Sequence, residues 1–286
     1  MKTQGSMKSV TDSANPEMSS DFTIKKPFDK STFALRVTLV MLAILTVYAF
    51  FSFDYKDIQI IGAIAATIEN FKIMFVEAHF AHFTFSEAIY QVLITIGLAF
   101  LTTLFGAVIA LFLGLFAAQN LSSKAASKAI KGIIAFIRAV PTVLWVLIFA
   151  ISAGLGSVAA VIGMTFHSIG YLTKAFSESF EELDEGVIEA LRGSGAGWWQ
   201  IVFQAVIPSS LTYLVSWTFV RFEINFGVSV AMGAAAGAGG IGYDMFMASG
   251  FYFDLREVGM ITYFILAFAI LLEVLATQLK KRLNVN

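Results

Sequence analysis

The sequence predicts an all-α integral membrane protein with six transmembrane helices, on three observations. Of the 286 residues, 58% are hydrophobic and only 14% are charged. A soluble domain averages about 25% charged residues, so this chain has too few charges to cover a globular surface. The apolar residues also form unbroken runs of about 20 residues, the length that a helix needs to cross a bilayer.

Composition also excludes several classes of site and partner. The chain contains no cysteine, which rules out disulfides, thiolate metal ligands and cysteine nucleophiles. A net charge of -1 with no basic block argues against nucleic acid as a partner. Residues 1–30 are polar and lack an apolar core of signal-peptide length, so they are expected to form an uncleaved cytoplasmic tail.

Lysine and arginine orient the predicted spans, because cytoplasmic loops retain these residues. The spans are expected at residues 33–53, 89–118, 133–151, 158–174, 210–235 and 257–279. Basic residues cluster before the first span, between the second and third, after the fourth and after the sixth. The opposite side holds only Lys56, Lys72 and Arg256. Both termini of this multi-pass cell-membrane (inner or plasma membrane) protein are therefore predicted to be cytoplasmic.

Residues 58–87 are predicted to lie on the outer side. Apolar residues recur there at helical spacing, whereas Glu69, Asn70 and Lys72 interrupt any spanning run. An amphipathic helix in the outer interface fits this pattern, and it joins the first span in a region covering residues 31–88. His79 and His82 are three residues apart, but without a carboxylate partner they are interpreted as surface residues, and no metal site is predicted.

The loop at residues 178–208 is too long and too acidic for a simple connection between spans. It is interpreted as a helix, a break permitted by Gly195, a short helix bearing Trp198 and Trp199, and a new membrane helix starting at Pro208. Aromatic side chains on such a loop indicate a partner surface. Anchoring of both tryptophans at the membrane interface explains them equally well.

This loop resembles the EAA loop of binding-protein-dependent ABC importer permeases. That pattern is Glu-Ala-Ala, three residues, Gly, nine residues, and Ile-any-Leu-Pro. Leu191, Ala205 and Ile207 depart from it conservatively. The resemblance implies a type I ABC importer permease fold in which Glu189–Trp199 is a coupling helix that docks on a separate ATPase. The residues expected to couple to the ATPase are Glu189, Ala190, Gly195, Trp198, Trp199 and Pro208.

A narrower resemblance, to phosphonate-type permeases, covers the chain from about Glu87 to its end. It is carried by Arg138–Thr142, Arg221–Asn225 and Gly237–Gly242, while Gly227 stands where that family favours a basic residue. The resemblance implies a cargo of phosphonate or a related phosphorus oxyanion, and a permease core at residues 89–286.

Ionisable groups inside a span are costly, which makes them candidates for the translocation pathway. Arg221 and Asn225 share one helix face, and Glu223 lies roughly opposite. A structural ion pair of Glu223 with Arg138 or with a neighbouring subunit is the alternative. Snorkelling also explains Arg138, and Pro141 is expected to kink the helix that carries it. An interhelical hydrogen bond also explains His167. The candidate pathway residues are Arg221, Glu223, Asn225, His167 and Arg138.

Gly237–Gly242 satisfies the pattern G-x-G-x-x-G, but it follows a membrane span and lacks the strand–turn–helix context of a dinucleotide site. These glycines are instead expected to permit a tight turn or a close helix approach. Gly97, Gly106 and Gly114 indicate close packing of the second span.

No G-x-x-x-x-G-K-[ST] motif occurs, so the chain should not hydrolyse ATP and no catalytic residue is expected. The resemblance implies an ABC ATPase dimer that binds ATP and Mg, a second permease copy in a homodimer, and an extracytoplasmic solute-binding protein, all in membrane lipid. An ABC permease for another solute, such as an amino acid, is the main alternative. A secondary transporter would need inverted repeats, and a membrane enzyme would need convergent acid–base groups.

Overall fold

The computed structural model describes residues 30–52 and 59–282, and all regular secondary structure in these ranges is helical. The chain forms two compact units, residues 1–60 and 61–286. The first unit contains α1 (Lys30–Ser52), and none of the residues of this helix is buried. The expected N-terminal tail, up to residue 29, and Lys56 lie outside the described residues.

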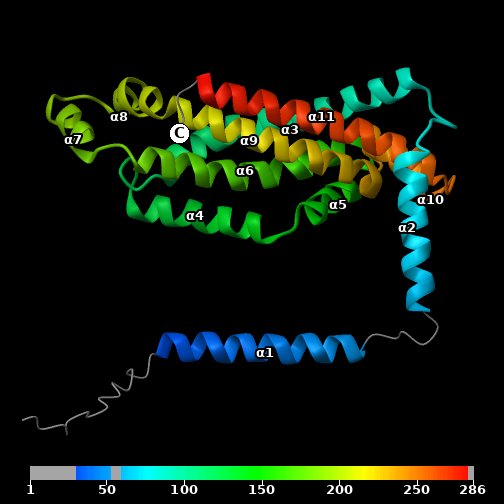
Figure 1. The fold of residues 1–286 in the computed structure, drawn as a ribbon. Helices are drawn as coiled ribbons and strands as arrows, with labels where there is room; N and C mark the ends of the chain where they lie inside the picture. Colours follow the sequence, from blue (N-terminus) through cyan, green and yellow to red (C-terminus); the bar gives the residue numbers. More distant parts are fainter. Residues whose placement is uncertain (1–29, 53–58, 283–286) are drawn as a thin grey trace, which may run out of the picture. The chain divides into compact units, whose positions relative to one another are not determined.

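The second unit is a bundle of long helices: α3 (Phe85–Ala117), α6 (Ser157–Glu181), α9 (Ile207–Ala236) and α11 (Leu255–Arg282) (Figure 1). Helix α6 packs against α3, α9 and the two helices before it. A Cβ at Gly106 would come within 2.6 Å of Ser168 Cβ, and one at Gly114 within 3.1 Å of Phe176 Cβ. The predicted close packing is confirmed at these two glycines. At Gly97 it is wrong, because no atom of the described residues lies within 4 Å of a Cβ built there.

Four helices among the described residues are long and apolar enough to cross a membrane: α1, α3, α11 and the continuous helix Trp198–Ala236. Helix α6 occupies the predicted fourth span and, at 25 residues, is long enough to cross. It does not meet the same apolar criterion. Many of its serine, threonine and glycine residues are buried against neighbouring helices, including Thr165, Ser168 and Gly170. Hydropathy therefore understates a helix placed inside a bundle.

The predicted span at residues 133–151 is divided between two helices. Two helices, α4 (Lys124–Ala139) and α5 (Thr142–Ala153), meet at 89°, and as a pair they would count as a fifth span. Pro141 has no N–H and forces Val140 into extended backbone. The Ile137 carbonyl, which would accept from residue 141, instead accepts from Trp145 Nε1 at 3.0 Å. The predicted bend at Pro141 is thus confirmed, and the Ile137 carbonyl that it frees accepts a side-chain hydrogen bond instead.

Helix α2 (Ile60–Val76) occupies the segment for which an amphipathic helix is predicted. It joins α11 through a hydrogen bond from the Tyr263 hydroxyl to the Phe75 carbonyl. Most of its large apolar side chains are exposed, including Ile61, Ile64 and Ile68. The helix is confirmed, and its position in the outer interface stays a prediction.

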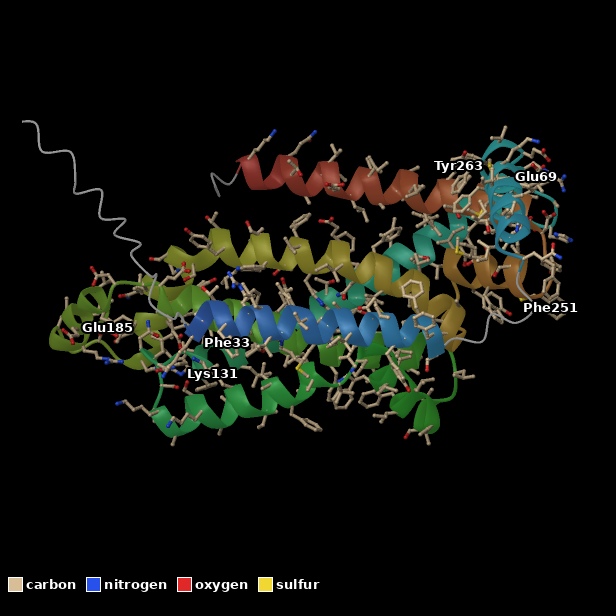
Figure 2. The ribbon with its side chains drawn as sticks, turned by 60° about the horizontal axis from the view of Figure 1, so that its bottom comes forward. Phe33, Glu69, Lys131, Glu185, Phe251 and Tyr263 are labelled. Atoms are coloured by element: carbon tan, nitrogen blue, oxygen red, sulfur yellow. The ribbon has the colours of Figure 1, made fainter. Side chains whose placement is uncertain are left out.

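Short elements mark the two ends of the bundle (Figure 1). At one end lie α7 (Glu185–Gly193), α8 (Trp198–Ile201) and the π-helical turn η1 (Val202–Val206). At the other end, α10 (Ile241–Gly250) links α9 to α11. Figure 2 shows Glu185 and Lys131 at the first end and Phe251 and Tyr263 at the second. We refer to these as the α7/α8 end and the α10 end.

Candidate functional site

The loop predicted to couple to an ATPase has the expected order of elements. Asp184 caps α7, because its side chain accepts from the Gly186 N–H at 2.8 Å. Gly195 then takes a φ of +87°, a left-handed conformation that a side chain would strain. The Gln200 side chain accepts from the Gly197 N–H at 2.6 Å and fixes the start of α8. Local signals in the sequence thus build the helix–glycine–helix unit.

Trp198 anchors this unit to the loop that follows α3. Its indole nitrogen donates to the Leu121 carbonyl at 2.8 Å, and its ring stacks on Phe116 with centroids 5.4 Å apart. Arg192 donates to the Asn120 carbonyl at 3.0 Å. Ile188 is buried in the apolar core cluster against which Trp198 packs. These contacts hold α7 and α8 on the bundle.

Trp199 has the opposite environment. Its side chain is 51% exposed and stacks on Phe203, which is 63% exposed. Glu189 and Ala190 of α7 are also exposed. The two adjacent tryptophans therefore differ: Trp198 is an internal anchor, whereas Trp199 and Phe203 form an exposed apolar surface, which we call the Trp199 surface.

Helix α9 does not begin after a break, as the sequence suggested for Pro208. The chain is helical without interruption from Trp198 to Ala236. Pro208, in the first turn of α9, has no N–H to donate to the preceding turn. Just before it, η1 widens the helix, and the Ile207 N–H bonds to the Val202 carbonyl five residues back. A π-helical turn thus accommodates the proline inside one continuous helix.

Arg221 and Asn225 share one face of α9, as their spacing predicted, and both lie inside the bundle. They are 2% and 0% exposed. Arg221 Nε donates to Ser168 Oγ at 3.1 Å, and Asn225 Nδ2 donates to Thr103 Oγ1 at 2.8 Å and to Ser168 Oγ at 3.0 Å. The guanidinium also lies over the Tyr171 ring, 5.3 Å from its centre. This network fastens α9 to α3 and α6.

One nitrogen of this network, Arg221 Nη2, is buried and has no hydrogen-bond partner among the described residues, and the same holds for Nδ1 of His167. Glu223 is half-buried and stays apart from the network. Among the described residues it has no ion pair with Arg138, so that predicted alternative is not seen within this chain. Sequence reasoning missed Thr103, Ser168 and Tyr171, because small hydroxyl residues and tyrosine are common in membrane helices.

Glycines bring α9, α10 and α3 together at the α10 end. Gly237, Gly239 and Gly240 have positive φ values of +61°, +82° and +74°. A Cβ at Gly242 would overlap the Val230 carbonyl oxygen, and one at Gly233 would come within 2.7 Å of the Tyr243 nitrogen. The Ile241 N–H donates to Thr95 Oγ1 at 3.0 Å. The predicted role of these glycines, a tight turn with close helix approach, is confirmed.

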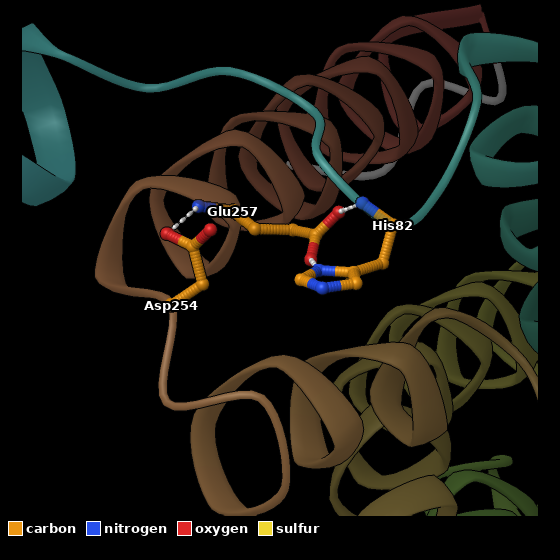
Figure 3. Close-up of side chains that lie close together, drawn as sticks. All are labelled: His82, Asp254 and Glu257. Carbon is orange, nitrogen blue, oxygen red and sulfur yellow. Dashed lines mark hydrogen bonds and ion pairs between the residues drawn. The ribbon is translucent and has the colours of Figure 1, made fainter.

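Glu257 fastens the segment before α3 to the start of α11 (Figure 3). One carboxylate oxygen accepts from the N–H groups of Ala81, His82 and Phe83 at 3.0, 2.7 and 3.1 Å. The other lies 2.8 Å from Nδ1 of His82, whose ring stacks on Tyr252. Asp254 is close enough for the three side chains to surround an ion. The carboxylate of Glu257 already has four donors, so the cluster is fully explained as a fastening.

Asp244 is a second buried carboxylate at this end, on α10. One oxygen accepts from Gln91 Nε2 at 3.2 Å, and the other has no hydrogen-bond partner within residues 30–52 and 59–282. Burial, together with the charges of Glu87 and Glu257, raises the pKa of Asp244 to about 6.

Comparisons with known proteins agree with this architecture. Residues 110–285 match the family described as binding-protein-dependent transport system inner membrane component. The phosphate-import permease protein PhnE of Mycolicibacterium smegmatis is 33% identical over 191 residues, which is 66% of this chain and 35% of that protein. The phosphite transport system permease protein PtxC of Stutzerimonas stutzeri is 34% identical over 145 residues, 51% of this chain and 52% of that protein. The chain thus spans about half or less of these relatives' length.

More distant similarities reach permeases for another solute. A probable D-methionine transport system permease protein MetI of Pasteurella multocida is 29% identical over 159 residues, 52% of this chain and 73% of that protein. An inward-facing structure of the MetNI methionine ABC transporter has a TM-score of 0.61 at 22% identity, over 69% of this chain and 96% of that chain. The fold is therefore that of a type I ABC importer permease, and this multi-pass membrane chain belongs to the family of binding-protein-dependent transport system inner membrane components.

Proposed function

We propose that this chain is the membrane-spanning subunit of an ATP-driven importer for phosphonate or a related phosphorus oxyanion. It carries no ATPase site of its own, and a separate ATPase dimer binds ATP and Mg. Permeases named for phosphate and phosphite, at 33% and 34% identity, support this cargo. The observation that carries the transport mechanism is the Trp199 surface, an exposed aromatic pair held at a fixed place by the anchored Trp198.

In this proposal the α7/α8 end is cytoplasmic, and so are both termini. Lys131, Lys174 and Arg192 lie at or near this end, as the retention of basic residues in the cytoplasm requires. Two copies of the chain flank one pathway in the lipid bilayer. A binding protein delivers the cargo at the α10 end, and the Trp199 surface docks on the ATPase, so that closure of the ATPase moves α8 and α9.

The candidate pathway residues fall into two groups. Arg221 and Asn225 are held inside one chain by Ser168 and Thr103, so in this conformation they position α9 against its neighbours. Glu223, His167 and Arg138 are less buried and can face a pathway between two copies. Cargo contact at these three residues is part of the proposal.

A permease for an amino acid is the second candidate. The similarity to methionine permeases, at 29% and 27% identity, favours it. Selection of the cargo would then depend on the binding protein and on residues that the phosphorus-type and methionine-type permeases do not share.

The test is uptake by liposomes that contain the permease, its ATPase and its binding protein. ATP-dependent uptake of labelled phosphonate, phosphite and phosphate is measured against labelled methionine. Trp199→Asp should abolish uptake by placing a charge in the apolar docking surface. Trp199→Phe keeps an aromatic ring and should retain uptake. Co-purification of the ATPase reports docking in each variant.

Uptake of methionine alone would exclude the phosphorus cargo and keep the importer. If Trp199→Asp transported as well as the wild type, the Trp199 surface would have no part in coupling.

A further inference from the structure

A cavity of about 250 Å³ lies between α4 and α6, towards the α7/α8 end. It is separate from both the Trp199 surface and the Arg221 network. Basic, acidic and hydroxyl side chains line it: Lys131, Arg138, Thr173, Lys174, Glu178 and Glu181. This volume lies just below the usual range for small-molecule sites, about 300–1,000 Å³, so its ligand must be small.

The charges in the cavity are unequal. Lys131 Nζ lies 2.8 Å from Glu181 Oε1, and Lys174 Nζ lies 3.4 Å from Glu178 Oε1. Glu181 accepts a further bond from the Gln119 N–H at 2.8 Å. Three cations and two carboxylates give a net charge of +1. Both carboxylates are engaged by lysines, and Arg138 has no carboxylate partner among the described residues.

Thr173 provides an independent sign of a ligand. Its side chain lines the cavity, the residue is only 1% exposed, and its hydroxyl has no hydrogen-bond partner in the described part of the chain. Buried polar groups are normally hydrogen-bonded, because an unpaired one keeps the cost of its lost hydration. An acceptor bound in the cavity would remove that cost.

The packing of α6 leaves room for the arginine beside the cavity. A Cβ at Gly170 would lie 2.9 Å from Arg138 Cγ and 3.2 Å from a methyl group of Ile137. The aliphatic stem of Arg138 therefore passes directly over Gly170. Close packing of this stem fixes the start of the side chain, so less rotamer freedom is lost when the guanidinium binds a ligand.

We propose that this cavity is a binding site for a small phosphate-type oxyanion. The guanidinium of Arg138 offers parallel N–H groups that match two oxygens of a tetrahedral anion, and the Thr173 hydroxyl donates to a third. Lys131 and Lys174 add positive charge nearby. The same chemistry is offered by free phosphate and by the headgroup of an anionic lipid, and the experiment separates these two sources.

The test measures binding of radiolabelled inorganic phosphate to the permease–ATPase complex in phosphatidylcholine nanodiscs, without ATP. Arg138→Gln should weaken the phosphate-binding component at this site by about tenfold or more, because it removes a charge-assisted pair. Thr173→Val should weaken it by about threefold. Lys128→Gln is the matched control: Lys128 is exposed on α4 and does not line the cavity, so binding should not change.

A second arm uses nanodiscs that contain phosphatidylglycerol, with retained lipid measured by native mass spectrometry. Retention in the wild type and in Lys128→Gln, but not in Arg138→Gln, would assign the site to a lipid headgroup. Arg138→Gln and Thr173→Val both matching Lys128→Gln, for phosphate and for lipid, would overturn the proposal. Because Arg138 is also a candidate cargo contact, this inference rests on the proposed function. Neither arm measures uptake, so a loss of phosphate or lipid binding at this site is scored separately from a failure of transport.

Discussion

The two ends of the bundle are held together by different chemistry. At the α7/α8 end a few long side chains reach across loops to single carbonyls, as Trp198 does to Leu121 and Arg192 to Asn120. At the α10 end the backbones themselves meet, because Gly233 and Gly242 have no side chain to separate them. Glu257 adds three bonds to consecutive N–H groups there.

This difference indicates how each end can change. Long side chains can rotate and form new contacts while the helices keep their structure, so the α7/α8 end can adapt to a moving partner. Close backbone packing has few alternatives, because an interior without voids shifts only as a whole. The α10 end should therefore tolerate substitution much less than the α7/α8 end.

The largest effect is expected for Gly242→Ala. The added methyl group would overlap the Val230 carbonyl oxygen, and we expect a loss of stability of about 3 kcal/mol or more. Gly227→Ala is the control, because in the described part of the chain no atom lies within 4 Å of a Cβ at this helical position. It should be neutral or stabilise α9 by about 0.5–1 kcal/mol. Thermal unfolding of the purified complex measures both, and equal midpoints would contradict rigid packing at the α10 end.

An intermediate effect is expected at the other end, from Trp198→Ala. The variant loses the indole hydrogen bond and the stacking on Phe116, and should cost about 2–3 kcal/mol because this tryptophan is only partly buried. Trp199→Ala removes an exposed ring and should leave the unfolding midpoint of the isolated permease within about 1 °C, a change below about 0.5 kcal/mol. A similar loss in both variants would mean that the two tryptophans do not have separate roles.

The smallest effect is expected for Asp244→Asn, and it depends on pH. Because the folded-state pKa is raised to about 6, the folded protein binds more protons here than the unfolded chain between about pH 4 and 6. Asp244 should therefore cost stability as the pH rises through this window and remain unfavourable above it. Asp244→Asn should raise the unfolding midpoint by a few degrees at pH 8 and by less at pH 5. An identical shift at both values would contradict ionisation of this carboxyl group.

Sequence reasoning identified helix positions and faces better than it identified partners. The helical spacing of residues predicted the shared face of Arg221 and Asn225. The residue types predicted the bend at Pro141 and the break at Gly195. Helical spacing could not reveal that Asn225 bonds to Thr103, 122 residues earlier in the chain, because contacts between helices depend on how the bundle packs.

The same limit explains the errors at the two ends. Trp198 and Trp199 are adjacent in one helical turn, and the same role was predicted for both. Successive residues of a helix nevertheless point about 100° apart, so the two side chains have different environments. Glu257 was expected only as the start of a span, whereas the structure surrounds it with the N–H groups of a distant segment. Hydropathy alone predicted one span at residues 133–151, because a bend does not interrupt an apolar run, and only Pro141 indicated the division into α4 and α5.

The π-helical turn at Val202–Val206 has a mechanical consequence. By accommodating Pro208 it keeps one helix continuous over 39 residues, from Trp198 to Ala236. At about 1.5 Å per residue, such a rod is about 58 Å long, and a tilt of about 5° about one end moves the other by about 5 Å. The exposed tryptophan and the glycine turn are therefore joined through one continuous helix, so a small tilt about either end displaces the other end by several ångströms.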